Sequence, residues 1–179
     1  MPELRPPTVR VHRSFVAAMA EFRAEGRGSS GDDSMIGAEL RRFGRDWVVP
    51  ENFAGYVDWL RSQALAESPR PDGWVPSTTL WWIQDDDYLG RLAIRHRLTP
   101  RLREVGGHIG YDVRPSARRR GHATAMLRAA LPVAYRLGIE SALVTCDPDN
   151  VASRKVIEST GGILADQRGG KLRFWVPTA

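Results

Sequence analysis

Apolar residues in the first third of the chain recur every three or four positions, the spacing that places them on one face of a helix. Two segments show this pattern, residues 11–25 (VHRSFVAAMAEFRAE) and residues 52–66 (NFAGYVDWLRSQALA). The pattern predicts two amphipathic helices. The stretch at residues 26–37 (GRGSSGDDSMIG) has almost no side chain to bury, and we expect a mobile loop there.

From residue 77 onward the sequence changes to the β-branched and alternating pattern of strands. Residues 77–84 (STTLWWIQ), the aspartates at 85–87 and residues 88–98 (YLGRLAIRHRL) predict a hairpin. Residues 104–113 (EVGGHIGYDV) predict a third strand. Its three glycines indicate a bulge or a close backbone approach.

The last third alternates helical and strand patterns. It predicts a helix over residues 119–137, a buried strand over 141–146, a helix over 147–160, and two strands at about 162–166 and 171–176. The element order is two helices, three antiparallel strands, helix, strand, helix and two strands. This order predicts a mixed α/β fold with a parallel crossover around the helix at 119–137.

Length and composition fit one globular domain over residues 1–179. The chain is 42% hydrophobic and 26% charged, and it has no apolar run of the roughly 20 residues that a membrane-spanning helix needs. Its N-terminus lacks the apolar stretch of a secretory signal. Cys146 is the only cysteine, which points to a reducing compartment, and we expect the cytoplasm.

The formal charge of +5 and pI near 10.0 raise the question of a polyanionic partner. Lys155 and Lys171 are the only lysines, so 24 of the 26 basic residues are arginines. The arginines are densest at Arg114 and at 118–120, directly before Gly121 and the start of a predicted helix. A glycine-containing helix start binds anions well, although a solvated arginine run is an equally simple interpretation. The absence of a Gly-Lys-Ser/Thr sequence disfavours a nucleotide hydrolase.

Two motifs of this chain resemble those of one enzyme superfamily. Residues 113–123 (VRPSARRRGHA) resemble the Arg/Gln-x-x-Gly-x-Gly/Ala motif, after a strand ending in Val-x-Pro, that binds acetyl-coenzyme A (acetyl-CoA) in GNAT N-acetyltransferases. Residues 150–153 (NVAS), Ile157 and the glycines at 161–162 resemble the second conserved helix of that superfamily. More loosely, residues 92–97, 106–111 and 146–162 are similar to a bacterial branch of predicted acetyltransferases.

The resemblance implies a central mixed, mostly antiparallel sheet of six to seven strands, flanked by about four helices and splayed between the fourth and fifth strands. Acetyl-CoA would lie in the splay, with its pyrophosphate on the backbone amides at 118–124 and its pantetheine arm along residues 111–113. Asn150 would hydrogen-bond the pantetheine, although a helix cap is an equal alternative. The cofactor-binding residues expected on this basis are Tyr111, Asp112, Val113, Arg118, Arg119, Arg120, Gly121, His122, Ala123, Thr124, Asn150 and Ser153.

The resemblance also implies direct attack of an amine on the thioester in a ternary complex, yet the usual catalytic side chains are absent. Ile157 stands where many relatives carry a tyrosine that protonates the thiolate, and Gly107 stands near the position of a catalytic glutamate in some relatives. The remaining candidates are His108, Glu104 and Tyr111. An ordinary histidine titrates near neutral pH, so we expect His108 to be the first choice for the base, although strand hydrogen bonds would explain it equally well.

The acceptor site has weaker candidates. Trp81, Arg95 and His96 lie on the predicted hairpin and could face the acceptor, although a core tryptophan and solvated basic residues are the simpler interpretation. Cys146 falls beside the expected thioester, but the sequence offers no paired His and Asp to activate it, so a buried structural thiol is favoured over an acetyl-cysteine intermediate.

We therefore predict an acetyl-CoA-dependent N-acetyltransferase that acts on the primary amine of a small molecule. The alternatives are a protein N-terminal or lysine acetyltransferase and an acyl-CoA-binding module without catalysis. Scattered arginines and the lack of a groove-reading motif argue against a nucleic-acid partner, and the hydropathy argues against a membrane. A homodimer is common among the proteins that this chain resembles.

Overall fold

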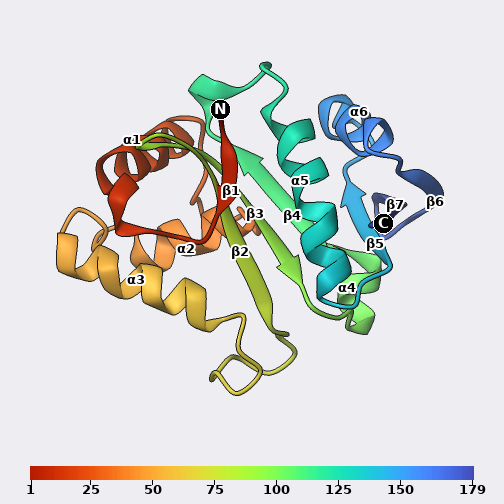
Figure 1. The fold of residues 1–179 in the computed structure, drawn as a ribbon, viewed down its shortest axis with the longest axis horizontal. Coiled ribbons are helices and arrows are strands. Elements are labelled where there is room, and N and C mark those ends of the chain that lie inside the picture. Colours follow the sequence, from red (N-terminus) through yellow and green to blue (C-terminus); the bar gives the residue numbers. More distant parts are fainter.

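The computed structural model describes all 179 residues as two β-sheets packed with six α-helices (Figure 1). The first sheet has the order β1-β2-β3-β4 and the second the order β5-β7-β6, and every paired strand is antiparallel to its neighbour. The strands are β1 (Glu3–Arg5), β2 (Ser77–Gln84), β3 (Asp87–Arg95), β4 (Ile109–Val113), β5 (Ser141–Cys146), β6 (Ile163–Arg168) and β7 (Lys171–Pro177). The helices are α1 (His12–Ala24), α2 (Met35–Phe43), α3 (Pro50–Ser62), α4 (Pro100–Glu104), α5 (His122–Arg136) and α6 (Val151–Ser159).

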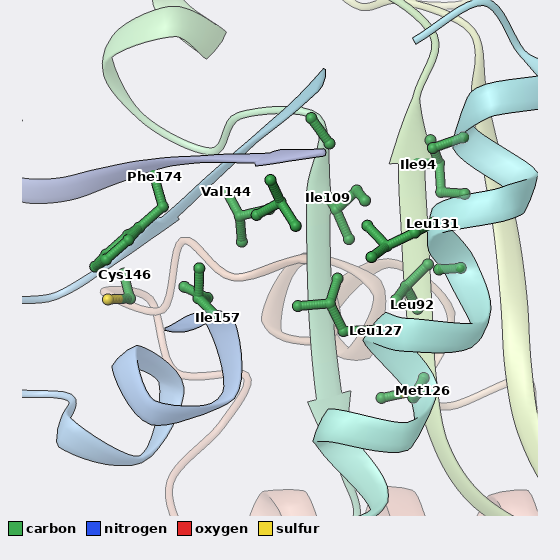
Figure 2. Close-up of a cluster of buried hydrophobic side chains, with 14 of the residues drawn as sticks. Leu92, Ile94, Ile109, Met126, Leu127, Leu131, Val144, Cys146, Ile157 and Phe174 are labelled. Carbon is green, nitrogen blue, oxygen red and sulfur yellow. The ribbon is translucent and has the colours of Figure 1, made fainter. Parts of the chain in front are cut away.

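The first sheet separates two hydrophobic cores. Because side chains alternate along a strand, Trp81 of β2 enters the core formed with α1, α2 and α3, whereas its neighbour Trp82 enters the core beneath α5. Figure 2 shows this second core, in which side chains of β3, β4 and α5 meet those of β5, β7 and α6. The second core therefore joins the two sheets, and α5 covers both.

The two sheets meet at the start of β4. The backbone N–H of His108 donates to Leu143 O at 2.7 Å, and the backbone N–H of Leu143 donates to Nδ1 of the His108 ring at 2.9 Å. A Cβ on Gly107 would lie 2.4 Å from Leu143 O, so only glycine allows this approach. No hydrogen-bonded ladder continues between β4 and β5, which point the same way in Figure 1. The predicted splay between the fourth and fifth strands is thus confirmed.

Two local predictions are wrong. Residues 26–37 are not one loop, because α2 begins at Met35, with the Ser34 side chain accepting a hydrogen bond from the Gly37 N–H as its cap. The strand predicted at 104–113 begins only at Ile109, because Glu104 ends the short helix α4, which the Thr99 side chain caps. The short strand β1 and the helices α2 and α4 were absent from the predicted order. The other helices and strands are present with shifted ends.

Candidate active site

The loop before α5 presents a run of unpaired backbone donors. Arg119 and Gly121 both adopt left-handed conformations, with φ of +63° and +78°, and Gly121 is the N-cap of α5. None of the backbone N–H groups of residues 119–124 donates to a group of the chain. The space around Gly121 is open, with no atom within 4 Å of a Cβ built there. Unpaired amides at the positive end of a helix favour an anion, as the sequence predicted.

The arginines around this loop differ in their contacts. Arg114 is held by Glu21 of α1 at 2.5 Å, and Arg118 is held by both carboxylate oxygens of Glu25 at 2.7 and 2.8 Å. Arg119 and Arg120 are exposed and form no ion pair. The cationic side chains that remain available to an anion are therefore those of Arg119 and Arg120, whereas Arg114 and Arg118 tie the loop to α1.

Tyr111 lies on the β4 face that meets α6. Its hydroxyl is 2.7 Å from the Ser153 hydroxyl, and burial raises its pKa to about 12 despite that hydrogen bond. The phenol therefore keeps its proton at neutral pH and can donate it. Ile157 is fully buried one turn further along α6 and packs in the core. The Tyr111–Ser153 pair, which joins β4 to α6, is a contact that the sequence alone did not reveal.

Asn150 begins α6 as its N-cap. Its side-chain oxygen accepts a hydrogen bond from the Ser153 N–H at 3.1 Å, which confirms the helix-cap interpretation. The side chain is exposed, and its amide nitrogen donates to no group of the chain. The cap therefore leaves the amide nitrogen available to a ligand.

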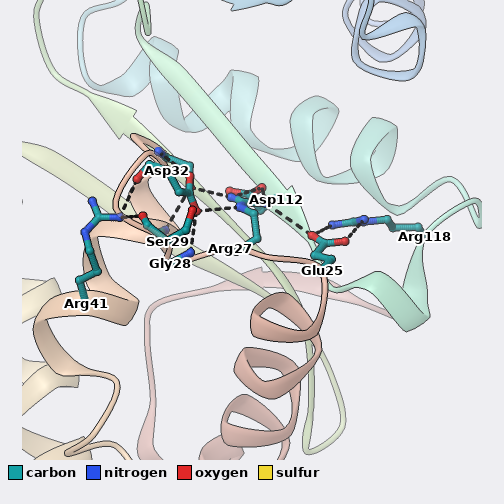
Figure 3. Close-up of polar contacts among 10 residues, drawn as sticks. Glu25, Arg27, Gly28, Ser29, Asp32, Arg41, Asp112 and Arg118 are labelled. Carbon is teal, nitrogen blue, oxygen red and sulfur yellow. Dashed lines mark hydrogen bonds and ion pairs between the residues drawn. The ribbon is translucent and has the colours of Figure 1, made fainter.

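Asp112 faces the opposite side of β4 and meets the loop between α1 and α2 (Figure 3). Its carboxylate accepts from Arg27 at 3.1 Å, and Arg27 also contacts Asp32 at 3.3 Å and donates to the Ser34 hydroxyl. Burial raises the pKa of Asp112, and the charge of Arg27 partly offsets that rise. Sequence reasoning missed this network, although an arginine and two aspartates inside a Gly/Ser-rich stretch were a signal for it.

His108 is buried, with 8% of its surface exposed. Burial, together with the charges of Arg103 and Arg95, lowers its pKa to about 4. Since Nδ1 already accepts the Leu143 N–H, the neutral ring carries its proton on Nε2 and has no free basic nitrogen. This geometry argues against His108 as the base and for a role in holding the sheets together.

Two further catalytic candidates lie in environments that disfavour them. Glu104 ends α4 and contacts Arg168 at 3.2 Å, which places it beside the β6–β7 hairpin. Cys146 is buried at the end of β5, and burial together with Asp147 raises the pKa of its thiol. A protonated, buried thiol is a poor nucleophile, which favours the structural interpretation of Cys146.

The three predicted acceptor residues do not converge. Trp81 is fully buried in the N-terminal core against Phe15, so it has no surface to offer a substrate, and its proposed role is corrected. His96 hydrogen-bonds the Thr78 hydroxyl and lies in a surface hollow with Arg70 and Arg97. Arg95 is on the α2 side of β3, where its Nη1 donates to the carbonyls of Gly106 and Gly107 at 3.0 and 3.1 Å.

A buried ionic cluster lies beside Arg95 and was also missed. Arg91, four residues earlier on β3, contacts Glu39 of α2 at 2.5 Å, and Tyr56 of α3 donates to the same carboxylate. The charge of Glu39 raises the pKa of Arg91 despite burial, so the guanidinium stays charged. This cluster anchors α2 and α3 on the sheet.

No helix in the structure is long and apolar enough to cross a membrane. No group of three or more His, Cys, Asp or Glu side chains is arranged to hold a metal ion.

Comparison with known proteins places these features in a family. Residues 34–163 match the family described as "Acetyltransferase (GNAT) domain". No curated protein matches the sequence. RimJ of Mycobacterium smegmatis, solved in complex with CoA-disulfide, is similar with a TM-score of 0.66 at 18% identity, over 97% of this chain and 80% of that chain.

Two further solved structures are similar. RimL, a ribosomal L7/L12 α-N-protein acetyltransferase, has a TM-score of 0.59 at 16% identity, over 98% of this chain and 90% of that chain. The microcin C7 self-immunity acetyltransferase MccE, in complex with acetyl-CoA and AMP, has a TM-score of 0.61 at 11% identity, over 97% of this chain and 91% of that chain.

Proposed function

Because this chain belongs to the family of GNAT acetyltransferases, which use acetyl-CoA, we propose that it acetylates the primary amine of a small molecule by direct attack in a ternary complex. The observation that carries this proposal is the unpaired run of amides at residues 119–124. These donors fit the pyrophosphate of the cofactor, and the open space at Gly121 lets a phosphate approach the backbone.

In this proposal the rest of the cofactor lies in the gap between β4 and β5, which is the place where no strand ladder joins the two sheets. β4 pairs with β3 on one edge and with no strand on the other. The Val113 carbonyl already accepts from Arg118 Nε at 3.1 Å, so the remaining backbone groups of residues 111–113 on the unpaired edge are available. A pantetheine arm would add there as an extended strand does. The free amide nitrogen of Asn150 at the start of α6 would hydrogen-bond the arm from the other side of the gap.

Tyr111 and Ser153 are the proton source that we assign to the reaction. When bound, acetyl-CoA would supply the acetyl group as a thioester, and its sulfur would need a proton on leaving. The Tyr111 hydroxyl, whose raised pKa keeps it protonated, shares a hydrogen bond with the Ser153 hydroxyl between β4 and α6. This pair takes the place of the tyrosine that Ile157 replaces, because its Ser153 hydroxyl lies on the same helix, one turn before Ile157, and Tyr111 of β4 is hydrogen-bonded to it.

No side chain of the site is assigned as the base. The basic nitrogen of His108 is occupied by the Leu143 N–H, and the Asp112 carboxylate is held by Arg27. We therefore propose that the amine reacts as its free base after losing its proton to water. Orientation within the ternary complex then supplies much of the rate.

A second candidate is acetylation of a protein N-terminus. The similarity to RimL, an α-N-protein acetyltransferase, favours it, since the fold of that protein aligns over 98% of this chain. Both candidates share the same cofactor site and differ only in the acceptor. A panel that contains small amines and short peptides with free N-termini separates them.

The test has two stages. Melting temperatures with and without acetyl-CoA measure binding, because a ligand of the native state stabilises it by about 2.7 kcal/mol at a hundredfold excess over its dissociation constant. Release of the CoA thiol with each member of the amine and peptide panel then measures turnover. No stabilisation at millimolar acetyl-CoA would overturn the cofactor assignment, and stabilisation without turnover on any member would favour a binding module. Turnover on peptides alone would favour the second candidate.

A further inference from the structure

Arg95 differs from the other arginines on the α2 side of the first sheet because no carboxylate partners it. Arg91, on the same face of β3, is paired with Glu39, and Arg27 is paired with Asp112 and Asp32. Arg95 forms no salt bridge, and only its Nη1 makes hydrogen bonds. Its Nη2 and Nε therefore have no partner in the chain.

The charged groups near Arg95 are cationic, and no carboxylate lies among them. Burial and the charge of Arg91 both lower the pKa of Arg95, whereas no carboxylate is close enough to raise it. Arg95 and Arg103 in turn lower the pKa of His108. A partly buried guanidinium without a counter-charge is costly, so this arrangement favours a ligand that brings negative charge.

The Arg95 side chain lies close to β4, beside the residue that precedes Tyr111. Nη1 lies 4.0 Å from the point where a Cβ of Gly110 would be, and the Met35 methyl of α2 lies 3.1 Å from that same point. Gly110 precedes Tyr111 on β4, so Arg95 and the Tyr111 hydroxyl lie on opposite faces of the strand at adjacent positions. Met35 and Arg95 are therefore the side chains that stand beside Gly110 on the α2 face of β4, where an acceptor on that face would contact them.

We propose that Arg95 binds a carboxylate of the acceptor, so that the preferred substrate is an amine that also carries a carboxylate. This proposal rests on the proposed acetyltransferase function and specifies its substrate class. The two free guanidinium nitrogens, Nη2 and Nε, form the planar fork that matches a carboxylate, and Nη1 stays on the Gly106 and Gly107 carbonyls that fix the plane of the group.

The experiment compares amines that differ only in this charge. Glycine, β-alanine and γ-aminobutyrate place a carboxylate at increasing distance from the amine, and glycinamide, β-alaninamide and 4-aminobutanamide are their neutral counterparts. Thiol release gives kcat/KM for each pair. We expect at least one carboxylate to exceed its amide by about tenfold or more, the size expected of a hydrogen bond to a charged group.

Three variants assign the preference to Arg95. Arg95→Gln should abolish the carboxylate preference while it leaves kcat/KM for the amides within about twofold. Arg95→Lys should keep part of the preference, because the charge remains without the planar fork. Arg103→Gln is the matched control, since it removes an exposed positive charge near His108 and should leave the ratio unchanged.

A binding readout keeps the proposal testable without turnover. In the presence of CoA, the preferred carboxylate should raise the melting temperature of the wild-type protein, and Arg95→Gln should remove that rise. Equal rates for carboxylates and amides, equal loss of both in Arg95→Gln, or no stabilisation by any carboxylate together with no turnover would each overturn the proposal. In the first two cases the wild-type protein would still bind acetyl-CoA and turn over neutral amines, so the proposed function would stand.

Discussion

The His108 ring accepts a hydrogen bond from the backbone N–H of Leu143 at 2.9 Å, and thereby joins β4 of one sheet to β5 of the other. The backbone N–H of His108 returns a second hydrogen bond to Leu143 O at 2.7 Å. Because no strand ladder connects β4 and β5, these two bonds fix the end of the gap that we assign to the cofactor. The residue that the sequence suggested as a base is thus a connector between the sheets.

Replacement of His108 tests this connection. His108→Ala leaves the buried Leu143 N–H without an acceptor, and we expect the free energy of unfolding to fall by about 1–3 kcal/mol. His108→Asn should be close to wild type, since its side-chain oxygen can take the place of Nδ1. Urea unfolding measures both. A fall in turnover of about a hundredfold or more with unchanged stability in both variants would instead support His108 as the base.

The same ring predicts an acid-sensitive component of stability. The folded protein holds the pKa of His108 at about 4, below the ordinary 6.5, so the unfolded chain binds the proton more tightly. Stability from this group is complete above pH 6.5 and is lost as the pH falls from 6.5 towards 4. His108→Asn should flatten that part of the pH profile relative to wild type. An unchanged profile would show that the ring is not held neutral.

The alternation and periodicity of the sequence predicted most of the fold, and local capping explains where they failed. The hairpin over β2 and β3 is strongly patterned, and the structure has it within three residues of the predicted ends. α2 was missed because Ser34 starts it inside a Gly/Ser-rich stretch whose composition indicates a loop. Glu104 was placed in a strand because the pattern does not show that Thr99 and Pro100 begin a short helix.

The Tyr111–Ser153 pair should affect turnover without affecting cofactor binding. Tyr111→Phe keeps the packing against the core and removes the hydroxyl, and Ser153→Ala removes its partner. We expect kcat to fall by about 10- to 100-fold in each, at the low end for general acid catalysis because a thiolate leaves readily. Single-turnover thiol release measures the step. Stabilisation by acetyl-CoA should persist in both variants, and wild-type rates in both would remove the pair from the mechanism.

The loop that we propose for the cofactor could be located from the sequence because its motif is contiguous, from Arg118 to Thr124. The α2 face of β4 could not, since it is assembled by contacts across the chain, such as Arg27 with Asp112, 85 residues apart. Trp81 shows the same limit. The sequence placed Trp81 in the hairpin. It did not show that the face of the sheet carrying Trp81 is covered by helices, which is why this side chain is buried.

Arg27 should stabilise the loop between α1 and α2 through Asp112. Both side chains are about one-fifth exposed, so we expect Arg27→Ala to lower the free energy of unfolding by about 2 kcal/mol, less than for a fully buried pair. A double-mutant cycle with Asp112→Ala should give a coupling energy of about 0.5–3 kcal/mol. Proteolysis within residues 28–33 should also become faster in Arg27→Ala.

The control for this cycle is the exposed pair of Arg154 and Glu158 on α6. A surface pair one helical turn apart contributes about 0.3–0.5 kcal/mol, so Arg154→Ala should have little effect. A coupling energy for Arg27 and Asp112 no larger than that of the surface pair would contradict a structural role for the network.

Gly121 and Gly138 separate backbone strain from loss of the cofactor site. Both glycines are left-handed, with φ of +78° and +83°, and neither has an atom within 4 Å of an added Cβ. Gly121→Ala and Gly138→Ala should therefore each lower the free energy of unfolding by about 1–2 kcal/mol, the strain of a left-handed alanine. Only Gly121 lies among the unpaired amides before α5, where a Cβ would occupy the space that a phosphate needs. We expect the Kd for CoA, measured by titration calorimetry, to rise about tenfold or more in Gly121→Ala, as for loss of a hydrogen bond to a charged group. In Gly138→Ala the Kd should match wild type. Equal affinity for CoA in the wild type, Gly121→Ala and Gly138→Ala would place the pyrophosphate away from this loop. The two variants carry the same substitution at left-handed glycines and differ in their position relative to the unpaired amides.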